Sequence, residues 1–185
     1  MKKIVIIGPE STGKSTLCEL LAKHYQTEWV REYAREYLQS NGASYDYDTL
    51  LEIAKGQVEK EELAINSWLL PGIPETPNRR LLFIDTDMYV MKIWEEYVFQ
   101  KCHHWILNRI VDRKYDLYLL CDIDLPWIKD DLREYPALKE RQQLYRYYKD
   151  NMINQQVPWV EISGTNYEQR LAKAIAAVDK EIISS

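Results

Sequence analysis

A loop that can hold phosphate groups lies near the start of the chain. The segment GPESTGKST matches the pattern G-x-x-x-x-G-K-[ST] in full. Its two glycines allow a backbone that turns successive amides toward an anion. The lysine brings a mobile positive charge to the β- and γ-phosphates, and the serine hydroxyl after it can ligate Mg²⁺. We therefore expect ATP and Mg²⁺ to bind at Gly8, Pro9, Glu10, Ser11, Thr12, Gly13, Lys14, Ser15 and Thr16.

A carboxylate ends a later apolar run. Asp85 follows the run Leu81 to Ile84, which is the place of a carboxylate that holds Mg²⁺ directly or through water. Ser15 and Asp85 are thus the expected metal ligands. Asp87, two residues further on, can share this task or bind substrate hydroxyls, and the alternative is that it caps a helix.

A further acidic residue lies after the short expected strand Glu28 to Val30. Glu32 can accept the proton of an acceptor hydroxyl or bind a substrate sugar. The alternative is an ion-pair cluster on a helix surface, since Arg35 and Glu36 lie three and four residues away. Glu32 and Asp85 are the two candidates for the catalytic base.

A charge-dense segment follows the fourth predicted strand. Phosphoryl transfer needs cations over the γ-phosphate as charge develops there, and a lid that closes over ATP also excludes water. Arg133 and Arg141, eight residues apart around Pro136, are the expected lid cations, with Arg146 as a third candidate. We predict a helical lid over about 126–145; the alternative is a solvated helical hairpin.

Short apolar runs alternate with helical patterns along the whole chain. The expected strands are Val5–Ile7, Glu28–Val30, Leu81–Ile84, Leu117–Cys121 and Trp159–Ile162. The expected helices are about Lys14–Tyr25, Glu32–Gln39, Asp46–Leu70, Asp87–Gln100, His104–Lys114, Pro126–Glu134, Leu138–Asn154 and a last one opened by a Thr165/Glu168 capping box.

This alternation indicates βαβ units and a parallel sheet. The strands are apolar on both faces, so helices must cover both sides of the sheet, and ligands bind at the carboxyl ends of the strands. The predicted fold is an α/β P-loop NTPase with a five-stranded, mostly parallel sheet, helices on both faces and a helical lid. We expect residues 1–185 to form one domain of this kind.

The composition excludes several classes of protein. With 24 Lys and Arg against 29 Asp and Glu, the net charge is -5, which argues against a general nucleic-acid binder. No apolar run approaches the roughly 20 residues of a membrane span, and the apolar stretch Ile4–Ile7 is too short for a signal peptide. The cysteines, 3 in number, are scattered, as in a reducing compartment. We therefore expect a cytoplasmic protein with a small-molecule substrate.

Several strings occur in an order that resembles one known family. GPESTGKST, REYAREY, FIDTD, DIDLPWIKDDLRE, RQQLY and VPWVEISG are similar to the ribosylnicotinamide kinase domain of NadR-type NAD-biosynthesis proteins, over nearly the whole chain. The resemblance implies ATP-dependent phosphorylation of the 5′-hydroxyl of nicotinamide riboside, giving nicotinamide mononucleotide. It also implies that Asp85 lies near Mg²⁺ and the acceptor hydroxyl, and that Arg133 and Arg141 are lid cations. Such proteins often carry an adenylyltransferase domain before the kinase; since this chain begins at the kinase strand, we expect that activity to be absent.

The acceptor side departs from the family in one place. Family members are expected to stack the pyridine ring between aromatics, one of them just before the E-Y-x-R-E string, where this chain has Arg31. The alternative stacking groups are Tyr33, Tyr89, Trp94 and Tyr97. The residues expected to bind the acceptor are Glu32, Tyr33, Arg35, Asp87 and Tyr89.

Three functions remain open beside the nicotinamide riboside kinase. One is a kinase for another nucleoside, and another is an ATPase or switch module that docks a protein partner on the helix 46–70. The third is a nucleotide-binding protein without turnover, against which the intact Lys14, Ser15 and Asp85 argue. The turn Ser163–Thr165 lies where P-loop kinases often pass their backbone around adenine, or it is only a turn with a helix cap.

Overall fold

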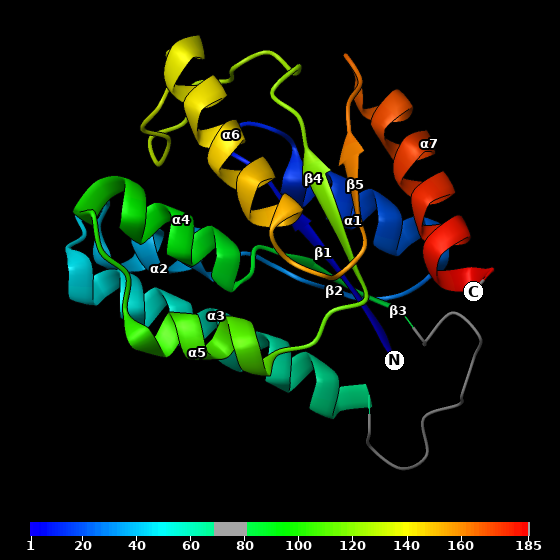
Figure 1. The fold of residues 1–185 in the computed structure, drawn as a ribbon, viewed down its shortest axis with the longest axis horizontal. Coiled ribbons are helices and arrows are strands. Elements are labelled where there is room, and N and C mark those ends of the chain that lie inside the picture. The colour runs from blue at the N-terminus through cyan, green and yellow to red at the C-terminus, as the bar shows by residue number, and fades with distance from the viewer. Residues whose placement is uncertain (69–80, 185) are drawn as a thin grey trace.

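The centre of the molecule is a parallel sheet. The structure is a computed structural model that describes residues 1–68 and 81–184. The strands pair in the order β2-β3-β1-β4-β5, and all four pairings are parallel (Figure 1). The strands are β1 (Lys2–Ile7), β2 (Trp29–Val30), β3 (Leu81–Asp85), β4 (Leu117–Cys121) and β5 (Trp159–Ile162). The predicted α/β fold with a five-stranded sheet is confirmed.

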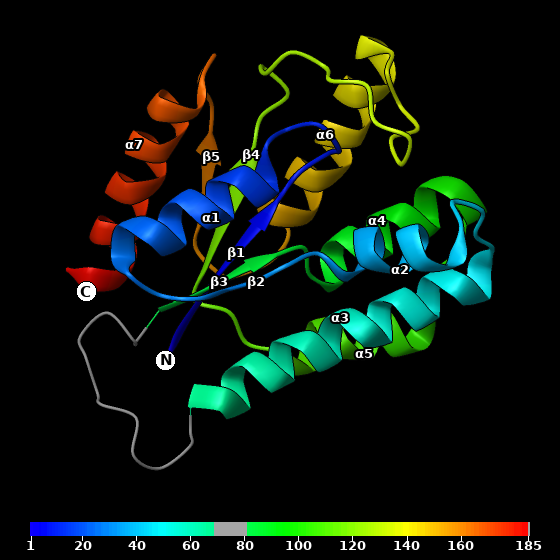
Figure 2. The ribbon, with the colours of Figure 1, turned by 180° about the vertical axis from the view of Figure 1, so that it is seen from behind.

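The two faces of the sheet carry separate cores because neighbouring strand residues point to opposite sides. In β1, Ile4 and Ile6 pack on one face, while Val5 and Ile7 pack on the other. The first face is covered by α1 (Lys14–Tyr25) and α7 (Tyr167–Val178). The second is covered by α3 (Tyr47–Trp68), α4 (Met88–Phe99) and α6 (Leu138–Ile153), as Figures 1 and 2 show. Burying each such side chain contributes about 1.5–3 kcal/mol.

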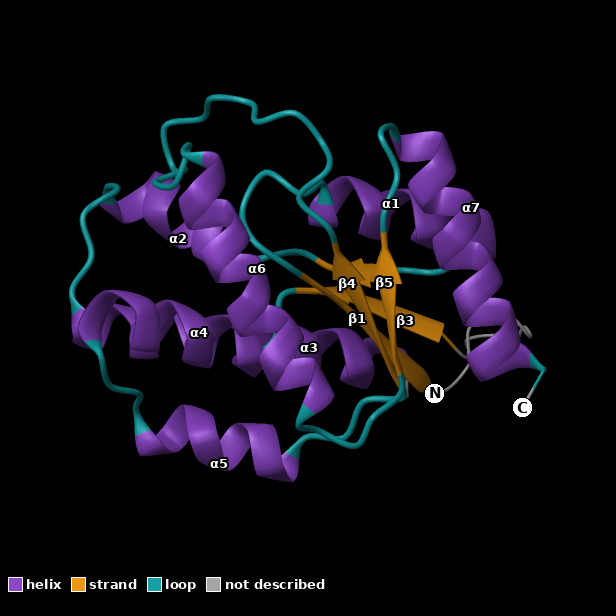
Figure 3. Cartoon of the chain, turned by 45° about the horizontal axis from the view of Figure 1, so that its top comes forward, coloured by secondary structure: helices purple, strands orange, loops and turns teal. Residues whose placement is uncertain are grey.

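A third cluster of buried side chains joins helices rather than strands. It lies between α2 (Tyr33–Asn41), α3, α4 and α5 (His104–Asp112), beside the sheet in Figure 3. Gly56, in the middle of α3, is explained here: a Cβ at this position would lie 2.0 Å from the ring of Tyr33. The helix accepts a residue of poor helix propensity because the aromatic ring occupies the space of the side chain.

The helix predicted at 126–134 is wrong, and with it part of the helical lid. Residues 126–137 are irregular, and α6 begins only at Leu138. The backbone amides of this segment bond to side chains instead of to a helical ladder: Ile128 to Ser11, Leu132 to Asp130 and Glu134 to Glu10. Only residues 138–145 of the predicted lid, which belong to α6, are helical.

Other helix ends differ slightly from the prediction. The cap of α7 is Asn166, whose side chain accepts from the Gln169 amide at 2.9 Å, while Thr165 donates its backbone amide, at 3.1 Å, and its hydroxyl, at 3.4 Å, to the Gln169 side chain. The Thr165/Glu168 capping box is therefore shifted by one residue. After α7 the chain continues in a π-helical turn, η2 (Asp179–Ile183). The end of the predicted helix 46–70 lies outside the described residues.

No helix in the described parts of the chain is long and apolar enough to cross a membrane.

Candidate functional site

The phosphate loop connects β1 to α1 and is held from two sides. Gly8 and Gly13 have φ values of +142° and +77°, where side chains are strained. A Cβ on Gly8 would lie 2.7 Å from the carbonyl oxygen of Cys121 in β4. A Cβ on Gly13 would lie 2.7 Å from the ring of Tyr167 at the start of α7. The two glycines are therefore required by close packing as well as by backbone conformation.

The loop forms the floor of a cavity of about 460 Å³. Every residue from Gly8 to Thr16 lines this cavity. The Lys14 ammonium donates to the carbonyl of Pro9 at 3.1 Å, and the buried Thr12 hydroxyl donates to the same carbonyl at 2.7 Å. Because α1 begins at Lys14, its positive dipole end faces the cavity. A polyphosphate in this cavity would meet backbone amides, a lysine and a helix N-terminus together.

A buried carboxylate lies beside the loop. Asp85 is completely buried, and neither of its oxygens has a hydrogen-bond partner among the described residues. Burial and the negative charge of Glu32 raise the pKa of Asp85 to about 7, while Lys14 and the Ser15 hydroxyl act in the opposite direction. Oxygens of Asp85 and Ser15 are the ligand type that Mg²⁺ prefers, and a cation there would compensate the buried charge. The residues present thus fit the predicted metal.

Glu32 lines the cavity, as predicted. Its Oε1 accepts from the Thr86 hydroxyl at 3.4 Å, and Thr86 lies between the two aspartates of the D-T-D string. Thr86 has φ +78°, a costly conformation for a β-branched residue that often marks a functional site. Sequence reasoning missed Gln57 of α3, which donates to the Asp85 carbonyl at 3.3 Å and accepts from the Tyr33 amide at 2.7 Å. Gln57 belongs to no recognisable sequence motif, so the sequence offered no signal for its role.

Asp87 does not line the cavity. It is buried, and its Oδ1 caps α4 by accepting from the amides of Tyr89 and Val90, as the alternative interpretation stated. Its Oδ2 accepts from the Tyr118 hydroxyl at 2.7 Å. Burial raises the pKa of Asp87 to about 6, although these hydrogen bonds act to lower it. Tyr33 and Tyr89 do not line the cavity either, so substrate binding by these three residues stays a prediction.

The segment predicted as the lid lies against the phosphate loop. Arg133 lines the cavity and donates to the Ser11 hydroxyl at 3.3 Å. Arg141 is buried and donates to the carbonyls of Ile123 and Leu125, each at 3.2 Å, so that it holds the start of the segment instead of lining the cavity. The Trp127 ring lies within 6.0 Å of both guanidinium groups. Catalytic action of Arg141 stays a prediction.

Two further contacts join the segment to neighbouring elements. The Glu10 carboxylate of the phosphate loop accepts from the backbone amides of Glu134, at 2.9 Å, and Tyr135. Burial raises the pKa of Glu10 despite these bonds. Arg35 of α2, predicted to bind substrate, lines the cavity and pairs with Asp130 at 3.0 Å. The segment therefore covers the loop in this structure.

One wall of the cavity is aromatic. Of the four predicted stacking groups, Trp94 and Tyr97 line it. Trp94 donates to the Tyr45 hydroxyl at 3.0 Å, and Tyr97 meets Tyr135 edge to face at 5.2 Å. Three further tyrosines that were not predicted, Tyr135, Tyr148 and Tyr167, line the cavity as well. The excess of tyrosine, 14 residues against 2 Phe, was a signal for such a surface, although it did not single out these positions.

The pattern of a known family, described as AAA domain (AAA_28), matches residues 3–170. The chain belongs to this family. Among curated proteins, this AAA domain is 23% identical over 182 residues to the trifunctional NAD biosynthesis/regulator protein NadR of Escherichia coli and to that of Salmonella typhimurium. Each match covers 96% of the chain but 42% of the relative, so the chain spans less than half of their length.

Solved structures show the same similarity. A NadR protein in complex with NR superposes on this AAA domain with a TM-score of 0.76 at 23% identity, over 97% of the chain and 49% of that protein. The deoxyadenosine kinase of M. mycoides superposes with a TM-score of 0.63 at 13% identity, over 96% and 99%. The resemblance to NadR is thus confirmed, and the fold is that of P-loop kinases.

Proposed function

We propose that the chain is an ATP-dependent kinase that transfers the γ-phosphoryl group to a nucleoside hydroxyl, with nicotinamide riboside as the acceptor. One observation carries the proposal: the buried Asp85 carboxylate lies beside a phosphate loop, and the cavity over this loop is lined by Lys14 and Glu32. A binding protein without chemistry has no need for a buried carboxylate with a raised pKa at this place. The comparison with nucleoside kinases supports the same class.

The phosphate loop would bind the triphosphate. Its amides and the Lys14 ammonium would hold the β- and γ-phosphates in place of the Pro9 carbonyl that Lys14 contacts here. Ser15 and Asp85 would hold Mg²⁺, which when bound neutralises charge on the β- and γ-phosphoryl oxygens. Arg133 would place a further cation over the transferred group, because it already lines the cavity beside Ser11.

Glu32 is the better candidate for the base. Its carboxylate lines the cavity and is partly exposed, so an acceptor hydroxyl could reach it. Asp85 does not line the cavity and is needed beside Ser15. We therefore assign proton acceptance from the hydroxyl to Glu32 and metal binding to Asp85.

The cavity wall favours a cationic aromatic acceptor. Trp94, Tyr97 and Tyr135 offer ring faces and edges, while Glu10 and Glu32 add negative charge on the same cavity. A pyridinium ring combines both properties that such a wall recognises. The solved NadR protein in complex with NR supports this acceptor.

The test is a panel of nucleosides, including nicotinamide riboside and deoxyadenosine, incubated with the chain and Mg-ATP and followed by mass spectrometry. We expect nicotinamide mononucleotide and ADP in equal amounts. If only another nucleoside is phosphorylated, the chain is still a nucleoside kinase, but nicotinamide riboside is not its acceptor. Release of free phosphate with no phosphorylated nucleoside would reject the kinase and favour an ATPase module.

A further inference from the structure

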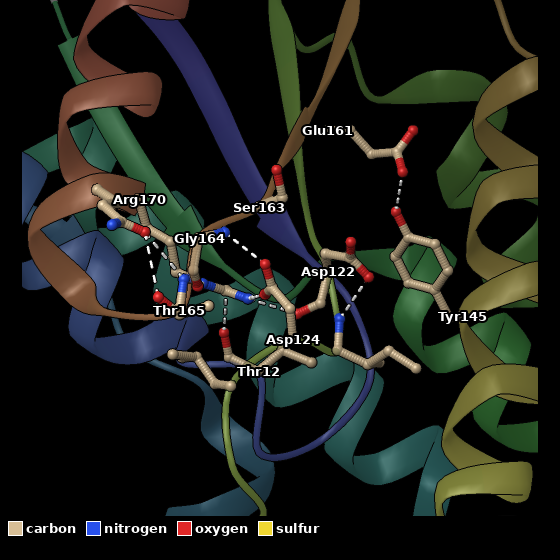
Figure 4. A network of polar contacts seen from close by, with 12 residues as sticks. Thr12, Asp122, Asp124, Tyr145, Glu161, Ser163, Gly164, Thr165 and Arg170 are labelled. Carbon is tan, nitrogen blue, oxygen red and sulfur yellow. Dashed lines mark hydrogen bonds and ion pairs between the residues drawn. The ribbon is translucent and has the colours of Figure 1, made fainter.

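A buried arginine at the start of α7 contacts the phosphate loop. Arg170 is 1% exposed. Its guanidinium donates to the carbonyl of Thr12 in the loop at 2.7 Å and to the carbonyl of Asp122 after β4 at 2.7 Å. It also donates to the carbonyl of Gly164 after β5 at 2.9 Å, so that one side chain links three loops (Figure 4).

The charge of this arginine is compensated by one aspartate. Asp124, in the loop after β4, forms an ion pair with Arg170 and accepts from the backbone amide of Gly164. The pair therefore holds the turn after β5 against the loop after β4, as Figure 4 shows. Removing one partner of a buried pair leaves a poorly compensated charge and costs far more than the pair gains in stability.

The residues next to this pair line one flank of the cavity. Leu125 and Pro126 directly follow Asp124, and Tyr167 lies one helical turn before Arg170. All three line the cavity, and both Leu125 and Tyr167 lie over Gly13 of the phosphate loop. This flank is apolar and aromatic, which suits stacking against a planar base.

Glu32 follows β2 and directly precedes α2, Tyr167 follows β5, and the phosphate loop follows β1, which lies between these two strands in the sheet. Both residues line the cavity, and Figures 1 and 3 show α2 and α7 on opposite sides of the sheet. In the proposed reaction the γ-phosphate must face the acceptor near Glu32. The nucleoside end of ATP must then extend along the other side of the loop, toward Tyr167.

We infer that Arg170 and Asp124 are positioning residues for the base of the nucleoside triphosphate. They hold Leu125, Pro126 and Tyr167 at a set place relative to the phosphate loop, so that the base and the phosphates of one nucleotide are bound together. The inference rests on the proposed function in taking ATP as the ligand and in placing the acceptor near Glu32.

The experiment compares two ligands by calorimetry on the full chain with Mg²⁺ and no acceptor: ATP, and inorganic tripolyphosphate, which lacks a base. The variants are Asp124→Asn and Arg170→Lys. The matched control is Lys173→Met, because Lys173 of α7 bonds to the Ser163 hydroxyl of the same turn at 2.6 Å but not to the phosphate loop. Circular dichroism at the assay temperature checks that each protein is folded.

We expect the wild type to bind ATP more tightly than tripolyphosphate. Asp124→Asn should weaken ATP binding about tenfold, the scale of one lost charge-assisted hydrogen bond, with tripolyphosphate nearly unchanged. Arg170→Lys should weaken ATP more than tripolyphosphate, and Lys173→Met should change neither. If Arg170→Lys does not fold, Asp124→Asn decides, since the Asp124 side chain is 29% exposed.

A merely structural role would lower the melting temperature and leave the ratio of the two affinities as in the wild type. That result, or a wild type without preference for ATP over tripolyphosphate, overturns the inference. Failure of the proposed function is distinguishable, because a chain that phosphorylates no nucleoside could still show the predicted change in this ratio.

Discussion

The Tyr118 hydroxyl donates a 2.7 Å hydrogen bond to the Asp87 carboxylate across the central strand of the sheet. Tyr118 belongs to β4, and Asp87 follows β3, the strand on the other side of β1. Since the other oxygen of Asp87 caps α4, the bond ties the start of that helix to the sheet. The hydrogen bond thereby helps to position Trp94 and Tyr97, the aromatic residues of α4 that line the cavity.

Tyr118→Phe removes the bond without changing the shape of the core. The buried Asp87 oxygen is then left without its donor, so we expect a loss of about 1–3 kcal/mol in the free energy of unfolding. Urea denaturation measures it. The control is Tyr147→Phe on α6, whose side chain is 44% exposed and which should cost little. Equal stabilities of the two variants would contradict the structural role of the bond.

Gly56→Ala tests the packing of Tyr33 on α3. Alanine is the better helix former, so helix propensity alone predicts stabilisation. The structure predicts the reverse, because the new Cβ would lie 2.0 Å from the Tyr33 ring and force it to move. We expect destabilisation by about 1–3 kcal/mol, measured by thermal unfolding. The control is Asn66→Ala at an exposed position of the same helix, which should not destabilise the protein. If Gly56→Ala stabilises the protein, the Tyr33 ring does not pack against Gly56 as described.

Glu32→Gln tests the proposed base. The amide keeps the size of the side chain but cannot accept the proton of the acceptor hydroxyl, so kcat should fall about 10²- to 10⁴-fold. ATP binding, measured separately by calorimetry, should stay nearly unchanged. Glu36→Gln, in the first turn of α2 directly after Glu32, is the control, because Glu36 pairs with Lys60 and does not line the cavity. If Glu32→Gln keeps the wild-type kcat, a residue other than Glu32 acts as the base.

Asp85→Asn separates stability from metal binding. Without Mg²⁺ the variant should be more stable than the wild type at pH 8, on the order of 1 kcal/mol, because a buried carboxylate without a partner is costly when ionised. With Mg²⁺ the variant should lose most of the magnesium-dependent gain in ATP affinity. Thermal unfolding and ATP titrations with and without Mg²⁺ measure the two effects. An unchanged magnesium dependence would argue against Asp85 as a metal ligand, and a lower stability without metal would contradict the expected cost of the buried carboxylate.

Much of the architecture could be predicted because its signals are local. The phosphate loop is one contiguous string whose glycines and lysine are required by backbone geometry and charge. The strands β3 and β4 are buried on both faces, so each shows as an unbroken apolar run. Because parallel strands end at one edge of the sheet, the proximity of Asp85 to the phosphate loop also followed from the sequence.

Local signals failed where long-range contacts decide the conformation. A helix was predicted over residues 126–134, but Ser11 and Glu10 of a distant loop accept hydrogen bonds from backbone amides of this segment, and it is irregular. Asp85 is the last residue of β3, and Asp87 lies only two residues further on. Asp87 is nevertheless held away from the cavity by hydrogen bonds from the Tyr118 hydroxyl and from the start of α4.

The sequence by itself determined the five strands, most of the helices between them and the phosphate loop, since each depends on neighbours in the chain. Only the tertiary structure decided which polar side chains face the cavity and which hold its walls. Arg141 and Arg170 are both basic residues on helices, and both prove to be buried and bonded to carbonyls of distant loops. Such roles are set by the partners that folding brings near, and a linear sequence does not contain that information at the positions themselves.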